Sequence, residues 1–146
     1  YEIVKETKAT KKMNEEQLLP FNNAKVLVAE DNPVNKFLIE KILKGWNVDF
    51  DMVENGKEAI EKLRENDYNL ILMDTFMPIM NGLEAIKLIR EGYAIGKEKI
   101  PIITFSAAVM ETDKETAIAA GANDVISKPF DPAVLHKKIK EYVITD

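Results

Sequence analysis

Cysteine is absent from the 146 residues of this chain. Its absence excludes disulfide scaffolds, thiolate zinc sites and cysteine nucleophiles, and it fits a reducing compartment. Long apolar runs are also absent: none approaches the ~20 residues of a membrane-spanning helix, and no signal peptide is visible. We therefore expect a cytoplasmic domain that makes no membrane contact itself.

Basic residues are in deficit, with 20 of them against 25 acidic residues and a net charge of −5. A mildly acidic domain gains nothing from the electrostatics of a phosphate backbone, so we do not expect direct nucleic-acid binding. Histidine occurs once, at His136, which we place on the solvated side of the last helix.

The chain divides into two parts by composition. Residues 1–24 are crowded with lysine and glutamate, contain few large apolar side chains and end in turn-forming residues. We interpret this segment as a linker or a marginal helix that joins an upstream domain. Residues 25–146 have the size of one domain. Because the chain begins at Tyr1 and not at methionine, we expect it to be part of a longer protein.

Strand and helix patterns alternate from Lys25 onward. Strands are expected at Lys25–Ala29, 48–52, Leu70–Asp74, Ile100–Phe105 and Val125–Ser127. Helices are expected to begin near Pro33, Asn55, Gly82, Thr112 and Asp131. This alternation predicts a three-layer α/β sandwich around a parallel sheet, with right-handed crossovers. In the first helix, the spacing of Val34, Leu38 and Ile42 predicts the buried face.

Charged residues follow three of the predicted strands. Asp74 ends the most apolar stretch of the chain, Glu30 and Asp31 follow the first strand, and Lys128 follows the last. The carboxyl ends of parallel strands meet at one edge, which is where open α/β sheets bind ligands. The sequence therefore predicts that three acids and one lysine converge there.

Such a cluster suits magnesium and a phosphoryl group. Asp31 and Asp74 would supply carboxylates to Mg²⁺, and Glu30 would act through a water or by holding a ligand. The metal would offset repulsion between the acids and the phosphoryl group. Asp74 could then attack phosphorus to form an acyl phosphate. Lys128 and the hydroxyl of Ser106 would interact with phosphoryl oxygens.

The motifs around these residues resemble the receiver (CheY-like) domain of two-component response regulators. The resemblance runs from Ala24 to about Val143 and is carried by four segments: Val28–Asn32, Leu72–Gly82, Ile103–Ala107 and Ser127–Phe130. It implies a flavodoxin-like, doubly wound fold with five helices and a five-stranded parallel sheet in the order 2-1-3-4-5.

The resemblance also implies a role for each residue of the cluster. Asp74 would be the phosphoacceptor, Glu30 and Asp31 the acidic pair, Ser106 the switch hydroxyl, Lys128 the phosphate-binding lysine, and Phe76 would give its backbone carbonyl to Mg²⁺. Two positions depart from the family pattern: Val125 stands where an aromatic residue is common, and Ser106 where threonine is common.

Partners follow from the same resemblance. The segment Glu30–Asn35 looks most like the C-terminal receivers of hybrid sensor histidine kinases. The expected donor is a histidine kinase or a histidine phosphotransfer domain, in cis or in trans, and the domain could be the cytoplasmic part of a membrane-anchored sensor. We expect the donor to contact Asn35, Phe37 or Leu38 of the first helix, although we favour a core position for Leu38.

Two other functions use the same residues. A magnesium-dependent phosphatase or phosphotransferase acting through an aspartyl phosphate usually has a second acid two residues after the nucleophile, where this chain has Phe76. A docking pseudo-receiver that is not phosphorylated would be favoured by loss of an acid, the acceptor or the lysine, and none is lost. We therefore prefer a signalling domain to a metabolic enzyme.

Overall fold

The computed structural model describes residues 20–21, 23–106, 111–128 and 131–143. Within these ranges five strands alternate with five helices, as predicted. The elements are β1 (Lys25–Ala29), α2 (Pro33–Gly45), β2 (Asp49–Val53), α3 (Gly56–Glu65), β3 (Leu70–Asp74), α4 (Gly82–Arg90), β4 (Ile102–Ser106), α5 (Glu111–Ala120), β5 (Asp124–Ser127) and α6 (Pro132–Val143). None of the described helices is both long and apolar enough to cross a membrane.

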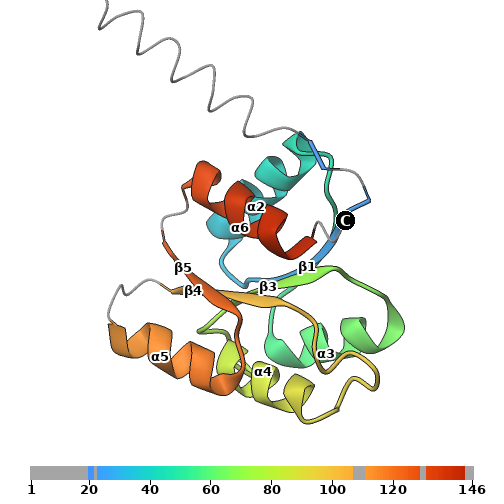
Figure 1. Cartoon of the computed structure of the whole chain (residues 1–146), viewed down its shortest axis with the longest axis vertical. Helices are drawn as coiled ribbons and strands as arrows, with labels where there is room; N and C mark the ends of the chain where they lie inside the picture. The colour runs from blue at the N-terminus through green and yellow to red at the C-terminus, as the bar shows by residue number, and fades with distance from the viewer. Residues whose placement is uncertain (1–19, 22, 107–110, 129–130, 144–146) are drawn as a thin grey trace, which may run out of the picture.

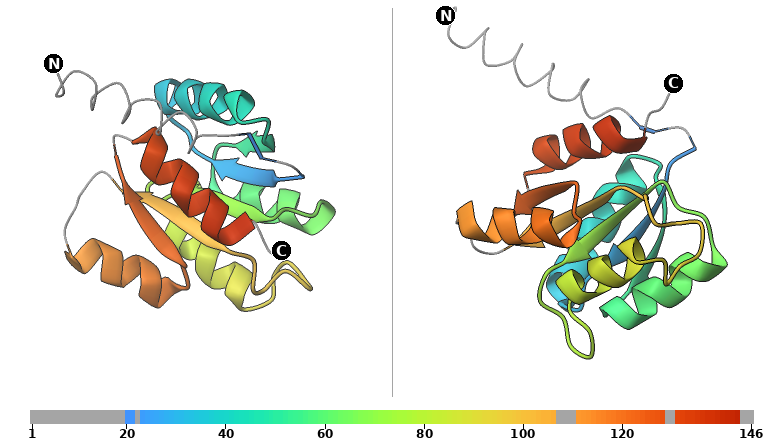
Figure 2. Two further views of the ribbon diagram at one scale, coloured as in Figure 1. Left: turned by 45° about the horizontal axis from the view of Figure 1, so that its top comes forward. Right: turned by 60° about the horizontal axis from the view of Figure 1, so that its bottom comes forward.

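The strands form one parallel sheet in the order β2-β1-β3-β4-β5, which confirms the predicted fold. Helices α2 and α6 cover one face, and α3, α4 and α5 cover the other (Figure 1 and Figure 2). The chain moves outward from β1 to β2 on one side and to β3 on the other, so the topological switch point lies between β1 and β3.

Each face of the sheet has its own apolar core. Along β1, Val26 and Val28 pack under α2 and α6, while Leu27 and Ala29 pack on the opposite side, as the two-residue period of a strand requires. All residues of β3 and β4 are buried, because a central parallel strand is covered on both faces.

Helix α2 buries a stripe that overlaps the predicted one only at Ile42, which packs partly buried against the core. Ile39 and Leu43 are fully buried, whereas Val34 is 74% exposed and Leu38 is 38% exposed. The expectation that Val34 and Leu38 face the core was therefore wrong. Both stripes have helical spacing, and the buried one continues into Trp46, which is only 6% exposed. The structure consequently leaves an apolar face of α2 uncovered.

His136 is also placed differently from the prediction, because it is buried and not solvated. Its ring centroid lies 4.7 Å from that of Phe21 and 4.8 Å from that of Trp46. The Phe21 amide donates a hydrogen bond of 2.7 Å to the Trp46 carbonyl. Packing therefore extends at least to Phe21, while the division of the chain near residue 24 stays a prediction.

Candidate functional site

The predicted charged residues meet at the carboxyl edge of the sheet. Carboxylate oxygens of Glu30, Asp31 and Asp74 lie within 4.8 Å of one another. Lys128 reaches the same point from the end of β5, with its Nζ 3.1 Å from Glu30 Oε1 and 3.2 Å from Asp74 Oδ2. The adjacency of β1 and β3 explains this convergence, since Ala29 pairs with Met73 and the next residues are the acids.

Burial and the neighbouring charges shift the pKa values of Glu30 and Lys128. Glu30 is fully buried, and burial raises its pKa, with the neighbouring charge of Asp74 acting in the same direction. Its Oε2 accepts a hydrogen bond of 3.1 Å from the Asn32 amide. Burial opposes the charge on Lys128, but the carboxylates of Glu30 and Asp74 outweigh it and raise the pKa of the ammonium group. Lys128 therefore remains a cation beside two acids.

The backbone after Asp74 is fixed by the neighbouring strand and helix. The Thr75 amide and hydroxyl both donate to the Phe105 carbonyl, at 3.3 and 2.9 Å. The Gly82 amide donates to the Thr75 carbonyl at 2.9 Å, so the first turn of α4 closes against the end of β3. A Cβ atom at Gly82 would lie 2.1 Å from the Asp74 carbonyl oxygen. Only glycine fits here without movement of the backbone.

The same loop contains a strained residue that the sequence reasoning missed. Ile79 has a φ of 67°, and the Met80 amide donates to the Pro78 carbonyl at 2.6 Å, which makes a tight three-residue turn around Ile79. A β-branched side chain is unfavourable in this left-handed region. The Gly56 amide holds the turn by donating to the Met80 carbonyl at 2.8 Å. The Ile79 side chain is 79% exposed.

The other predicted site residues lie at the same edge. Ser106 is the last residue of β4 and is 7% exposed. Its carbonyl accepts a hydrogen bond of 2.8 Å from the Lys128 amide, which places Lys128 beside β4. Phe76 lies two residues after Asp74, with its side chain 75% exposed. The roles of the Ser106 hydroxyl and the Phe76 carbonyl stay predictions.

The acidic residues fit a divalent cation. Their carboxylate oxygens are hard donors of the kind that Mg²⁺ prefers, and the three carboxylates are close enough to share one ion. Buried Glu30 Oε1 accepts no hydrogen bond among the described residues, and its ionic contact with Lys128 is its only compensation there. Lys128 neutralises only part of the negative charge of the three carboxylates. A second cation at this edge would relieve the repulsion that remains among them.

Solved structures with this fold include several receiver domains. One is the receiver domain of a sensor histidine kinase from Pseudomonas aeruginosa, which was solved with a magnesium ion coordinated in its active site cleft. It matches with a TM-score of 0.77 and is 31% identical in sequence, and the match covers 84% of this chain and 98% of that chain. Another is the co-crystal structure of the Saccharomyces cerevisiae histidine phosphotransfer signaling protein Ypd1 and the receiver domain of its downstream response regulator Ssk1. It matches with a TM-score of 0.77 and is 30% identical in sequence, and the match covers 86% of this chain and 95% of that chain.

Sequence relatives agree with the structural ones. Hybrid signal transduction histidine kinase I of Dictyostelium discoideum is 39% identical over 132 residues, which covers 87% of this chain and 7% of that protein. The chain spans only 4% to 27% of the length of the curated relatives it matches. The family model of the response regulator receiver domain matches residues 26–140. The chain therefore belongs to the response regulator receiver domain family.

Proposed function

We propose that this domain accepts a phosphoryl group from a phosphohistidine on Asp74, with Mg²⁺ bound by Asp31, Asp74, the Phe76 carbonyl and, less directly, Glu30. The observation that carries the proposal is the position of the Lys128 ammonium, 3.2 Å from Asp74 Oδ2 beside three clustered carboxylates. The magnesium ion in the related Pseudomonas receiver supports the choice of metal. When bound, Mg²⁺ supplies positive charge to the phosphoryl oxygens.

The side chains of this domain supply the rest of the chemistry. An Asp74 carboxylate oxygen attacks phosphorus, the phosphorus–nitrogen bond of the donor breaks, and its electron pair returns to the imidazole. Lys128 neutralises one phosphoryl oxygen, and the Ser106 hydroxyl donates to another. Asp74 is only 6% exposed, so solvent competes little for its carboxylate.

Labelling with a small phosphodonor tests this proposal. Acetyl phosphate with Mg²⁺ should give an acid-labile phosphoryl group that peptide mapping assigns to Asp74, because the site contains both the nucleophile and its cationic partner. Chelation of the metal should prevent labelling. Label at another residue, or equal label without Mg²⁺, would contradict the proposal.

The partner we propose is a histidine phosphotransfer domain or a histidine kinase, in cis or in trans. Apolar side chains are exposed on α2 and on the loop after Asp74, both of which begin at the carboxyl edge. We call this set the apolar rim, and it consists of Val34, Phe37, Leu38, Phe76 and Ile79. A small apolar surface with a polar border is typical of transient interfaces. The co-crystallised yeast receiver and phosphotransfer protein support this kind of partner.

The hybrid kinase among the relatives supports a wider context. We propose that the domain is a receiver of a cytoplasmic signalling protein, with a donor histidine outside residues 1–146, because the sole histidine of this chain is His136. His136 is buried against two aromatic rings. It cannot present its imidazole to Asp74 from there.

Phe37→Ser should separate partner docking from chemistry. Phe37 is 68% exposed and contributes apolar area to the rim, so we expect phosphotransfer from a histidine phosphotransfer protein to fall by about tenfold, or ~1.4 kcal/mol. Labelling by acetyl phosphate should not change. Ile118→Ser is the matched control, because Ile118 is 43% exposed but lies in the second half of α5, away from the carboxyl edge. Equal loss with both donors would show damage to the site itself.

Phe76→Asn should shorten the life of the phosphorylated state. The exposed ring of Phe76 has no polar group to orient an attacking water, and it could shield phosphorus, whereas an amide could position that water. We expect dephosphorylation in magnesium buffer to be roughly tenfold faster, which corresponds to ~1.4 kcal/mol of barrier. An unchanged half-life would show that the Phe76 ring turns away from the phosphoryl group.

A further inference from the structure

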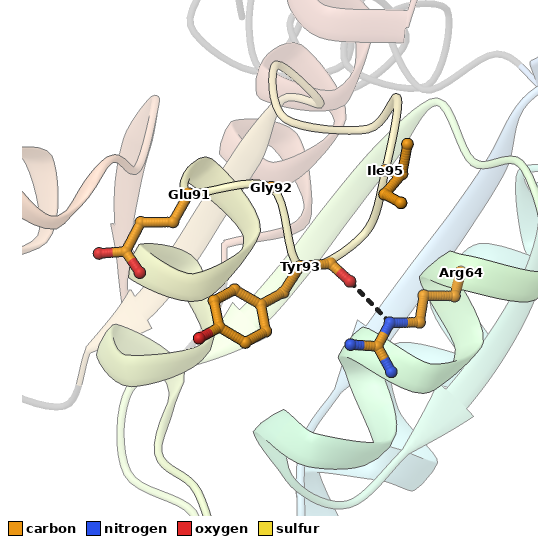
Figure 3. A pocket seen from close by; sticks show the side chains of 5 residues that line it. All are labelled: Arg64, Glu91, Gly92, Tyr93 and Ile95. Carbon is orange, nitrogen blue, oxygen red and sulfur yellow. Dashed lines mark hydrogen bonds between the residues drawn. The ribbon is translucent and has the colours of Figure 1, made fainter.

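A second surface lies at the opposite edge of the sheet from Asp74. The last turn of α3 and the connection between α4 and β4 enclose an open pocket of about 570 Å³, lined by Arg64, Glu91, Gly92, Tyr93 and Ile95 (Figure 3). Both elements precede strands, so the pocket is at the amino edge, away from the carboxylate cluster.

The connection that forms one wall is held firmly in place. Arg64 Nε donates a hydrogen bond of 2.6 Å to the Tyr93 carbonyl. Lys97 Nζ donates to the Leu63 and Asn66 carbonyls, at 2.6 and 2.8 Å, and so binds the connection to the end of α3. Ala94 is fully buried between these contacts. A loop fixed in this way loses little conformational entropy when it binds a partner.

This ordered loop nevertheless presents large apolar groups to solvent. Tyr93 is 52% exposed and Ile95 is 88% exposed, on either side of the buried Ala94. Single exposed apolar residues are ordinary. Here, however, two lie on one fixed loop beside an arginine. Tyrosine and arginine are among the residue types that contribute most at protein interfaces, and Ile95 adds apolar area next to them.

The charge of Arg64 is available to a ligand. Among the described residues it takes part in no ion pair, and Nε is its only side-chain atom with a hydrogen-bond partner. Glu91 lies on the opposite side of the Tyr93 ring from Arg64, and its carboxylate points away from the guanidinium (Figure 3). The two remaining nitrogens can therefore pair with a carboxylate in the bidentate manner that arginine favours.

We propose that this pocket binds a protein segment that presents an acidic side chain next to a large apolar one. The carboxylate pairs with Arg64, and the apolar side chain packs on Tyr93 and Ile95. Because the pocket is open to one side, it suits an extended segment better than a small enclosed ligand. Its distance from Asp74 in the fold leaves the carboxyl edge free for a phosphodonor at the same time.

A matched pair of peptides tests the proposal. The ¹⁵N-labelled chain is titrated with acetyl-Leu-Phe-Glu-amide and with the same peptide carrying Gln in place of Glu. We expect saturable shifts at the amides of residues 92–96 and at Arg64 Nε, with the acidic peptide bound about threefold to fivefold more tightly, as an exposed ion pair allows. No saturable shift, or equal affinity for the two peptides, would overturn the proposal.

Variants of the pocket complete the test. Ile95→Ser should weaken binding of both peptides, and since the Ile95 side chain is almost fully exposed it leaves the loop unchanged. Arg64→Gln should remove the preference for the acidic peptide. Lys57→Gln makes the same charge change on an exposed residue at the start of α3 and should leave binding as it is. If Arg64→Gln still preferred the acidic peptide to the Gln peptide, the assignment would be overturned.

Labelling of Asp74 by acetyl phosphate should be the same in these three variants as in the unaltered chain. Failure of the pocket proposal is therefore distinct from failure of the phosphoacceptor function.

Discussion

Asp74→Asn is expected to remove all acid-labile phosphoryl label from the domain. Asparagine keeps the shape of the side chain, but its amide is neither a competent nucleophile for phosphorus nor an anionic ligand for Mg²⁺. The ionic contact of 3.2 Å between Lys128 Nζ and Asp74 Oδ2 is lost as well. Both acetyl phosphate and a phosphorylated histidine protein should fail as donors, because the loss is in the acceptor.

Asp49→Asn is the matched control for this experiment. Asp49 is an exposed acid at the start of β2, at the amino edge of the sheet, and its replacement makes the same change of charge away from the cluster. The Asp49→Asn variant should take up as much phosphoryl label as the unaltered chain. Persistent label in Asp74→Asn would place the acceptor elsewhere, and label lost from both variants would point to a general effect of charge.

The carboxyl edge could be predicted from the sequence because its position follows from topology. Asp74 and Lys128 each follow an apolar strand, and strands that alternate with helices must run parallel. Both residues therefore lie at the carboxyl edge. Strand β4 separates β3 from β5, and the long Lys128 side chain spans it to make the ionic contact of 3.2 Å with Asp74. The roles that the family resemblance assigned, such as phosphoacceptor for Asp74 and phosphate-binding lysine for Lys128, depend on these same residues at the strand ends.

Helix faces were harder to predict, because the helical period alone allows more than one stripe. In α2 the spacing of Val34 and Leu38 is as regular as that of Ile39 and Leu43, yet only the second pair is buried. The choice depends on how the helix rests on the sheet, which is a tertiary property. His136 was misplaced for a related reason: its neighbour Phe21 lies in a segment whose composition suggested a linker.

Contacts between distant loops left no local signal at all. Arg64 meets the Tyr93 carbonyl across 29 residues, and no short-range pattern encodes such a pair. The left-handed turn at Ile79 is equally hidden, because isoleucine is among the residues least suited to that conformation. The adjacent Asn81–Gly82 was a visible turn signal, but it did not show that Gly82 must approach the Asp74 carbonyl.

Gly82→Ala should destabilise the domain and disturb its phosphorylation together. The new Cβ would lie 2.1 Å from the Asp74 carbonyl oxygen and 2.9 Å from Met73 Cγ. The first of these contacts is with backbone, so no side-chain rotation relieves it. Either the end of β3 or the start of α4 has to move, and overpacking of this kind costs about 3 kcal/mol of unfolding free energy. The displaced loop also carries Phe76, so Mg²⁺-dependent labelling of the folded fraction should slow.

Gly45→Ala separates this steric effect from the general effect of adding a methyl group. Gly45 lies at the end of α2, and a Cβ there would meet no atom within 4 Å. Alanine favours the helix over glycine, so this variant should be more stable than the unaltered chain by up to about 1 kcal/mol. Urea unfolding of both variants measures the difference, which should approach 4 kcal/mol by the sum of these two estimates. Equal stability of the two variants would mean that the loop after Asp74 yields easily, and that Gly82 does not fix the position of the acceptor.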